Sequence, residues 1–215
     1  MRIKSLVAAM AAVASLAPIA AQAQAQAAEE NPWLVRVRAV SVNWQNGQSG
    51  NASTYNIKAQ NQWLPELDVS YFFTKNIATE LVLTWPQKVN IVSNAVPGTT
   101  GSITALPPSL LLQYHFTDLG AFKPYIGAGI NYTIYGNKSN FPQLNNGLTV
   151  SNTSFGAVGQ IGADYMFDKN WGANIDVKYA TISTNTNANS SYPALGTGKL
   201  TLNPWMPAVG ITYKF

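Results

Sequence analysis

The side chains that could do chemistry in this sequence are charged residues that stand two positions apart between apolar neighbours, as Arg36 and Arg38 do in WLVRVRAVSV. Side chains at this spacing lie on one face of a β-strand. Such a set could act in acid–base catalysis, bind a metal ion or form ion pairs. It contains four cations, five anions and one histidine: Arg36, Arg38, Glu66, Asp68, Glu80, His115, Asp164, Asp176, Lys178 and Lys214.

Neither catalysis nor metal binding is indicated by this set. His115 is the only histidine and the chain has no cysteine, so one imidazole and scattered carboxylates are the only candidate metal ligands. A histidine base also needs a nucleophile beside it, and no serine or acidic constellation accompanies His115. We therefore predict ion pairs, no enzymatic activity and no cofactor.

The overall composition favours strands and turns. Only 10% of the residues are charged, against about 25% in typical soluble domains. Gly, Asn, Thr, Ser and aromatic residues are abundant instead. The formal charge is +4, and without Arg2 and Lys4 it falls to 11 − 9 = +2. A charge this small does not indicate a nucleic-acid partner.

The N-terminal segment 1–27 is predicted to be a cleaved signal peptide, and 28–215 the mature domain. Arg2 and Lys4 precede an apolar run over 6–20, and AQA repeats then offer small residues for cleavage. A membrane anchor is the alternative, but a proline and several glutamines interrupt the run before about 20 apolar residues accumulate. The mature protein is therefore expected to be exported.

Eight alternating segments make up most of the mature chain. In the first, Val35, Val37 and Ala39 alternate with Arg36 and Arg38, which is the two-residue period of a strand. Each segment has about the length that a tilted strand needs to cross a bilayer. The predicted strands are 33–42, 65–73, 77–85, 109–116, 124–135, 154–167, 171–182 and 204–215.

The connections between these segments alternate between short and long. The short ones are 74–76, 117–121 and 168–170, and the long ones are 44–62, 86–105, 136–152 and 183–200. Short turns on one side and long loops on the other are typical of outer-membrane barrels. We therefore predict an all-β protein, an eight-stranded antiparallel transmembrane β-barrel in the outer membrane of a Gram-negative cell.

Aromatic residues cluster at the segment ends, where membrane barrels carry two interfacial girdles. The predicted periplasmic girdle is Trp33, Phe73, Phe116, Phe122, Phe167, Trp171 and Phe215, and the predicted outer girdle is Trp44, Trp63, Trp85, Phe155 and Trp205. A soluble eight-stranded barrel of the lipocalin kind is the alternative, but it explains neither the girdles nor the loop asymmetry. An aromatic end also resembles the signal that the outer-membrane assembly machinery reads, so Tyr213 and Phe215 are predicted to be that signal.

The inward-facing residues divide by height. The ten charged and histidine residues listed above lie toward the periplasmic half, and we call them the plug residues, because they are expected to pair and block water flow in a narrow barrel. The inward residues of the outer half are apolar, and we call them the vestibule residues: Val40, Val42, Leu64, Val82, Leu111, Val158, Ile182 and Met206. A porin would be polar there, so a site for small hydrophobic ligands and simple core packing are both open.

Prolines and glycines suggest further features of the wall. Prolines interrupt ladders, so Pro86, Pro97, Pro107 and Pro108 make a lateral gap near the third and fourth strands conceivable, and Pro124 and Pro207 are expected to cause bulges. Inward glycines either leave room for a ligand or relieve crowding, and they are Gly127, Gly129, Gly156 and Gly162.

The chain resembles the OmpW family of outer-membrane proteins, which includes the AlkL-type alkane-uptake proteins. The resemblance covers nearly the whole mature chain and rests on WLVRVRAVSV, PELDVSYFFTKNIATEL, LPPSLLLQYHF, KPYIGAGINYT, SFGAVGQIGADY and the NPW…VGITYKF end. It implies an eight-stranded barrel with a hydrophobic channel that aids the entry of small hydrophobic compounds. The predicted partners are outer-membrane lipid and lipopolysaccharide, the barrel assembly machinery and small hydrophobic ligands.

A receptor or structural barrel is the alternative function. The long connections are neutral and rich in Asn, and they could contact a phage, a toxin or a host surface without any transport.

Overall fold

The computed structural model describes residues 31–93, 96–139, 148–188 and 196–215. The predicted signal peptide, 1–27, lies outside the described residues. The helix present in the described part is the four-residue α3 (Asn51–Thr54). No helix in that part is long and apolar enough to cross a membrane.

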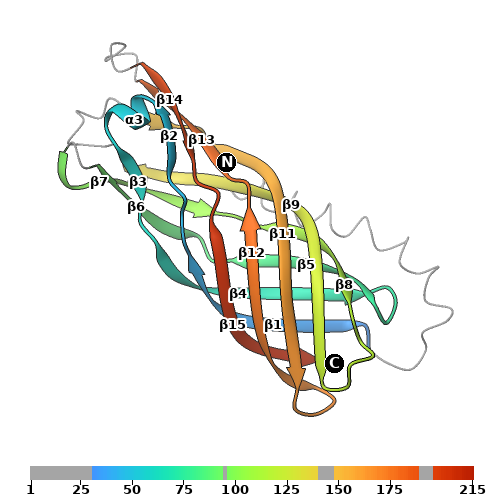
Figure 1. Cartoon of the computed structure of the whole chain (residues 1–215). Coiled ribbons are helices and arrows are strands. Elements are labelled where there is room, and N and C mark those ends of the chain that lie inside the picture. The colour runs from blue at the N-terminus through green and yellow to red at the C-terminus, as the bar shows by residue number, and fades with distance from the viewer. Residues whose placement is uncertain (1–30, 94–95, 140–147, 189–195) are drawn as a thin grey trace.

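Eight strands form a closed antiparallel barrel, as predicted (Figure 1). The ring runs β11, β12, β15, β1, β4, β5, β8, β9, and it closes because β9 also pairs with β11. The first strand pairs with the last, from Leu34 with Lys214 to Val40 with Ala208. The barrel strands are β1 (Trp33–Val42), β4 (Gln62–Phe72), β5 (Ile77–Thr84), β8 (Ser109–His115), β9 (Phe122–Ser139), β11 (Thr153–Met166), β12 (Trp171–Ala180) and β15 (Trp205–Lys214).

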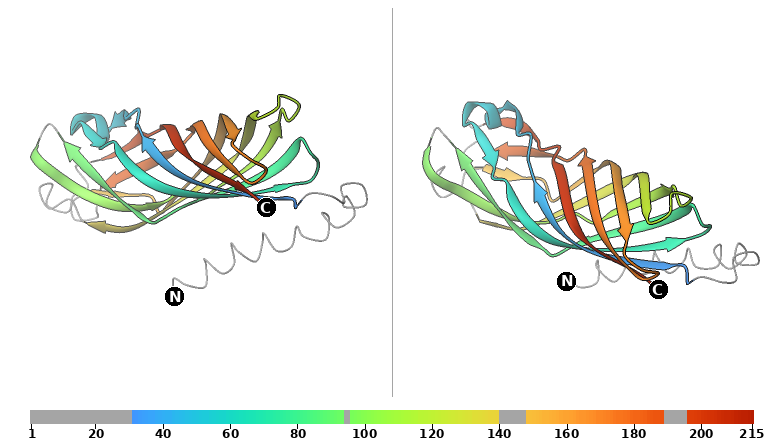
Figure 2. Two further views of the ribbon diagram at one scale, coloured as in Figure 1. Left: turned by 90° about the horizontal axis from the view of Figure 1, so that it is seen from below. Right: turned by 60° about the horizontal axis from the view of Figure 1, so that its bottom comes forward.

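The wall continues as strands beyond the ends that we predicted. The long connections were expected to be loops, and this expectation is wrong for most of their described residues. Those residues form β2 (Gly47–Gly50), β3 (Ile57–Ala59), β6 (Gln87–Ser93), β7 (Val96–Leu106), β10 (Leu148–Val150), β13 (Ser183–Ala188) and β14 (Thr197–Thr201). The pairing of β13 with β14 continues the register of β12 with β15, because Tyr179 pairs with Trp205 and Ser183 pairs with Thr201. We call this part the extension, and Figure 2 shows α3 at its end of the barrel, far from the C-terminus.

Strand pairing explains why such polar segments are extended. Asn, Gly and Ser have little strand preference of their own. A neighbouring strand nevertheless satisfies their backbone N–H and C=O groups, and the barrel strands below already hold each neighbour in place.

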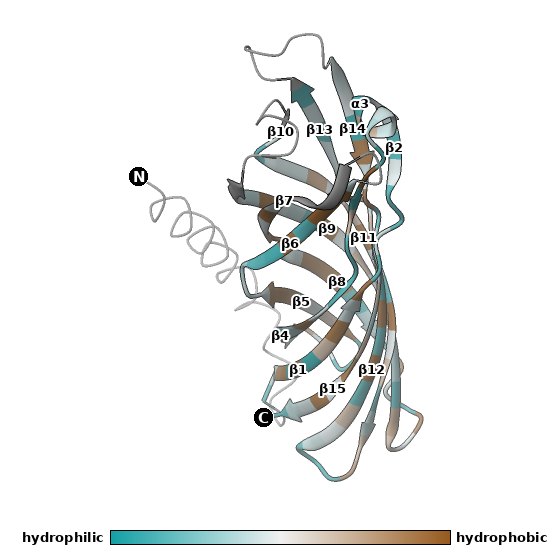
Figure 3. Ribbon diagram, turned by 90° about the vertical axis from the view of Figure 1, so that its left-hand side faces the viewer, coloured by the Kyte–Doolittle hydropathy of each residue, from teal (hydrophilic) through white to brown (hydrophobic). Residues whose placement is uncertain are grey.

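Large apolar side chains cover the outside of the barrel strands. Val37, Ile161 and Ile175 are 57%, 62% and 61% exposed. Figure 3 shows apolar and polar residues alternating along these strands. A soluble barrel would bury this set, so the outward apolar face supports the membrane barrel over the lipocalin alternative.

The aromatic residues lie at both ends of this apolar band, with one exception. Trp63, Trp85 and Trp205 are exposed at the long-loop end, and most of the short-turn set is exposed as well: Trp33, Phe116, Phe122, Phe167, Trp171 and Phe215. Trp44 does not belong to the outer girdle, contrary to our prediction. It is partly buried against the interior core, and its indole N–H donates to the Gln60 carbonyl at 3.0 Å.

The prolines act on the ladders without shifting them. Pro124 pairs with Ala163 and Pro207 with Val177 in unbroken registers, so the predicted bulges are absent from the described strands. Pro207 has no N–H to donate to β1, and the β1–β15 ladder is interrupted beside it. Continuous pairing ends at Val40 with Ala208, and an isolated bridge joins Asn43 to Trp205 beyond the interruption.

The turn between β11 and β12 is held by one carboxylate. Asp168 accepts hydrogen bonds from the backbone N–H groups of Trp171 and Asn170, each at 2.7 Å. These bonds favour the ionised form, so they lower the pKa of Asp168 below its ordinary value.

Candidate functional site

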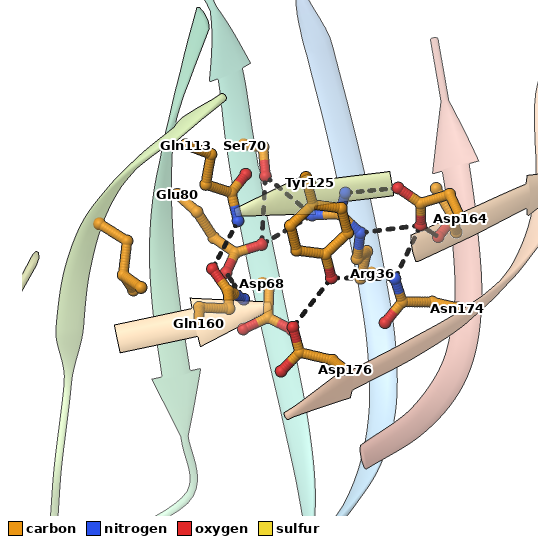
Figure 4. A network of polar contacts seen from close by, with 12 residues as sticks. Arg36, Asp68, Ser70, Glu80, Gln113, Tyr125, Gln160, Asp164, Asn174 and Asp176 are labelled. Carbon is orange, nitrogen blue, oxygen red and sulfur yellow. Dashed lines mark hydrogen bonds and ion pairs between the residues drawn. The ribbon is translucent and has the colours of Figure 1, made fainter. Parts of the chain in front are cut away.

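The interior of the barrel toward its short-turn end is filled by ion pairs that join one strand to another (Figure 4). Arg36 of β1 binds Asp164 of β11 through two bonds, Nε to Oδ1 at 3.0 Å and Nη2 to Oδ2 at 2.6 Å. Its Nη1 also donates to Glu80 of β5 at 2.7 Å and to Ser70 at 3.2 Å. Alternation on β1 places both of its arginines inward, and this two-point geometry is the strong form of an arginine–carboxylate pair.

Arg38 is the centre of a second group. Its guanidinium lies 2.5 Å from Asp68, 3.1 Å from Glu66, 3.2 Å from Asp176 and 3.4 Å from Glu80. All of these side chains are at most 2% exposed. Four carboxylates around one cation leave an excess of negative charge.

Lys178 partly offsets this excess. Its Nζ lies 2.6 Å from Glu66 and 3.1 Å from Asp176. The pairs around Arg36, Arg38 and Lys178 therefore join three cations to five carboxylates. Among the described residues, Asp68 Oδ1 has no hydrogen-bond partner.

Tyr125 is a central member of this network that the sequence reasoning missed. Its hydroxyl donates to Asp176 at 2.9 Å and accepts from Arg38 at 3.2 Å. Its ring lies 4.6 Å from the Arg36 guanidinium and stacks on His115 at 4.9 Å. The alternation along β9 could have predicted its inward direction, because Tyr125 stands between two outward-facing residues.

The plug residues are thus brought together, and eight of the ten form ion pairs. His115 is buried and bonds Gln113 at 3.0 Å, rather than a nucleophile. Lys214 is half-buried at the short-turn end of β15, where it pairs with Leu34 in the ladder. The other eight plug residues carry the ion pairs described above, and their role in blocking flow stays a prediction.

The vestibule residues line or surround a cavity directly above these ion pairs. All are buried except Met206, which packs against them. Leu111 and Val158 belong to the surrounding core, and the other six line the cavity: Val40, Val42, Leu64, Val82, Ile182 and Met206. The vestibule cavity is narrow, because only about 30 Å³ of it is open to the centre of a water-sized sphere. Whether it binds a ligand stays a prediction.

The inward glycines fit tightly, which supports the crowding interpretation. A Cβ added to Gly162 would lie 2.4 Å from the Tyr125 hydroxyl, and one added to Gly129 would lie 1.9 Å from the Leu110 carbonyl oxygen. Gly162 is therefore needed where the tyrosine crosses the interior.

A second apolar cavity lies within the extension. Only about 20 Å³ of it is open to the centre of a water-sized sphere, and it shares Trp44, Val89, Ala105 and Tyr135 with the vestibule cavity. We call it the upper cavity, and its other apolar lining residues are Ile57, Ala59, Ile91, Ile103, Val150, Leu200 and Leu202. The sequence reasoning missed these residues, although IKA, KVNIV and KLTL each show a short alternation.

The wall beside the vestibule cavity has an interrupted ladder. Pairing of β5 with β8 stops at Val82 with Ser109. Pairing of β6 with β7 begins at Gln87 with Ala105, and its register is shifted by one residue relative to the β5–β8 pairing. Pro107 lies in this interval and lines the cavity.

The comparisons with known proteins agree with this architecture. The model of the OmpW family matches residues 29–215. An uncharacterized outer-membrane protein, y4mB of Sinorhizobium fredii, is 42% identical over 92% of this chain and 86% of its own length. Outer membrane protein W of Escherichia coli is 35% identical over 69% of this chain and 71% of its own.

A solved structure shows the same barrel. The crystal structure of the outer membrane protein OprG from Pseudomonas aeruginosa superposes with a TM-score of 0.71 at 26% identity, covering 85% of this chain and 95% of that one. The short-turn end is therefore periplasmic and the extension extracellular. With its eight-stranded barrel and a family match that covers all of the described residues, the chain is an outer-membrane protein that belongs to the OmpW family.

Proposed function

We propose that this barrel assists the entry of small hydrophobic molecules into the cell. The observation that carries the proposal is the pair of stacked apolar cavities, which share Trp44, Val89, Ala105 and Tyr135. An apolar solute that enters them has to push lining side chains aside, and it loses contact with water as it does so. Most of that lining is apolar, and the charged side chains in it are Glu66 and Lys178 of the vestibule cavity. The family resemblance points to the same class of solute.

The plug network argues against straight passage to the periplasm. An apolar molecule moving past Arg36 and Arg38 would separate buried ion pairs, which costs several kcal/mol for each charge left alone. The solute therefore needs another way out of the vestibule cavity.

Lateral exit into the membrane is the finer part of the proposal. The wall has its interrupted ladder between β5 and β8, and Thr84, Gln87 and Pro107 line the vestibule cavity at that height. A gap in backbone pairing is the place where side-chain movement alone can open a path, since no ladder bond needs to break there.

The first experiment fills the junction of the cavities. Ala105→Phe adds a ring at a residue that lines both cavities, while Ala157→Phe adds the same ring on the exposed, lipid-facing side of β11. We expect uptake of an apolar dye to fall at least fivefold in cells with Ala105→Phe and to stay within twofold with Ala157→Phe. Outer-membrane levels of the two variants must match.

The second experiment tests the exit. Pro107→Thr with Pro108→Thr supplies two ladder donors, so uptake should fall while dye binding to the purified barrel is retained. Equal uptake in all strains, including one that lacks the protein, would contradict transport and favour a receptor barrel. If uptake falls with Ala105→Phe but not with Pro107→Thr and Pro108→Thr, entry through the cavities is supported and lateral exit at this place in the wall is contradicted.

A further inference from the structure

Charge is segregated along the barrel axis. The segments 40–65, 85–110, 136–153 and 181–206 contain four lysines and no Asp or Glu. The described carboxylates lie instead in the plug network or on the periplasmic turns. The extracellular half is therefore cationic, and nothing in the proposed transport uses that charge.

Three of these lysines lie on the outer wall of the extension, in β3, β6 and β14. Each stands beside an inward residue that is at most 2% exposed, so its own side chain points outward. We call them the outer lysines, and they are Lys58, Lys88 and Lys199, with inward neighbours Ile57, Val89 and Leu200.

The outer lysines share one side of the wall. Lys58 pairs with Val92 of β6, the strand that carries Lys88. Lys199 pairs with Ser49 of β2. Side chains connect β2 to β3, since the Gln48 amide donates to the Ile57 carbonyl at 2.7 Å. The three charges therefore lie on three of four neighbouring strands, β14, β3 and β6, with β2 between β14 and β3.

Their heights follow from the outer aromatic girdle. Trp85 is 78% exposed and marks the membrane interface. Lys88 comes three residues later, about 7 Å above it for a strand tilted by about 45°. Lys199 precedes Trp205 by six residues, but residues 202–204 lie outside the strands, so its height is at most about 14 Å. Lys58 pairs with Val92, seven residues after Trp85, which gives about 16 Å.

We propose that the outer lysines bind the anionic part of lipopolysaccharide, namely the lipid phosphates and the acidic sugars attached to them. The strands beside them offer no carboxylate, so the lysines are open to an external anion. A phospholipid carries its phosphate at one height, whereas lipopolysaccharide carries phosphates and carboxylates outward from the membrane. The outer lysines also lie at more than one height above the membrane, which matches lipopolysaccharide.

Neutral donors on the same wall suit the sugar hydroxyls between these anions. Gln60 and Asn90 are exposed beside the lysines. Hydrogen bonds from amide side chains to sugar oxygens add to the attraction between lysine and phosphate.

The experiment compares charge removal at the two ends of the barrel. Lys88→Gln with Lys199→Gln removes two exposed lysines from the extension, and Lys75→Gln with Lys169→Gln removes two from the periplasmic turns. Both purified double variants, folded in detergent, are titrated with fluorescent lipopolysaccharide. Each lysine at an anionic surface contributes about fivefold in affinity, so the first variant should bind about 25-fold more weakly and the second within twofold of the wild type.

Two further arms separate this ligand from other anions. Dephosphorylated lipopolysaccharide should reduce the difference between the wild type and Lys88→Gln with Lys199→Gln. Equal weakening in both double variants would overturn the proposal, because it would mean a non-specific charge effect. Binding of phosphatidylglycerol vesicles as tight as that of lipopolysaccharide would also overturn it. Unchanged urea midpoints of the variants show that folding is intact.

Discussion

Replacing Arg38 by methionine should destabilise the barrel by about 3–5 kcal/mol, the cost of leaving a buried charge unpaired. The guanidinium contacts Asp68, Glu66, Asp176 and Glu80 at 2.5, 3.1, 3.2 and 3.4 Å. Methionine keeps much of the side-chain length and packing but removes the group that touches all four carboxylates. The loss therefore reports electrostatics more than volume.

The partner residue gives an asymmetric expectation. Asp68 is bonded through Oδ2 to Arg38 alone, and its Oδ1 has no partner among the described residues. Asp68→Asn lowers the carboxylate excess and leaves Arg38 three anions, so it should cost about 1.5 kcal/mol or less. The double variant should be more stable than Arg38→Met alone, because one of the stranded carboxylates is gone.

Urea unfolding in phospholipid vesicles, followed by tryptophan fluorescence, measures these differences. Lys75→Met is the matched control, since it breaks an exposed pair with Asp118 at 3.4 Å and should change stability by about 0.5 kcal/mol or less. The reasoning is refuted if Arg38→Met costs no more than Lys75→Met, or if Asp68→Asn costs as much as Arg38→Met.

Two other predictions use the same unfolding assay. Gly162→Ala should cost about 1–3 kcal/mol because the new Cβ meets the Tyr125 hydroxyl at 2.4 Å. Gly159→Ala, where an added Cβ meets no described atom within 4 Å, should cost clearly less, and equal costs would contradict the clash. Asp168→Ala should lower the urea midpoint at pH 7. Since the folded pKa of Asp168 is lowered, its contribution is present above the unfolded value and is lost as pH falls, so the difference should shrink below about pH 4. A gap that widens in acid would exclude this role.

Strand alternation with charge predicted the membrane part of the fold closely. The first strand runs over Trp33–Val42 as predicted, because arginine and valine cannot exchange faces when one side is lipid. The extension was not predictable in the same way. Parts of it, such as STNTNA in β13, are polar on both faces, so no pattern distinguishes a strand from a loop there. Other parts, IKA, KVNIV and KLTL, alternate only over a few residues.

The candidate site was predictable to the extent that parity determines direction. The inward or outward parity of each residue and its height along the strand grouped ten plug residues, and the structure joins eight of them in ion pairs. The same two criteria grouped the vestibule residues. The partner choices were not predictable, because Arg36 meets Asp164 only through the curvature and closure of the ring. Trp44 was assigned to the membrane surface from its type, but the segment after β1 turns its ring inward.

The plug also bears on how the chain reaches its place. Arg36 and Asp164 are 128 residues apart in the chain, and Lys178 and Glu66 are 112 apart, so these ions meet only when distant strands have joined. In an open sheet the same charges face water and keep one side hydrated, which makes the unfinished barrel an amphipathic surface that cannot enter hydrocarbon. Closing the ring removes those charges from water and presents a wholly apolar exterior. Closure and insertion are thus coupled by the eight side chains that form the ion pairs, and a chain that fails to close stays outside the membrane.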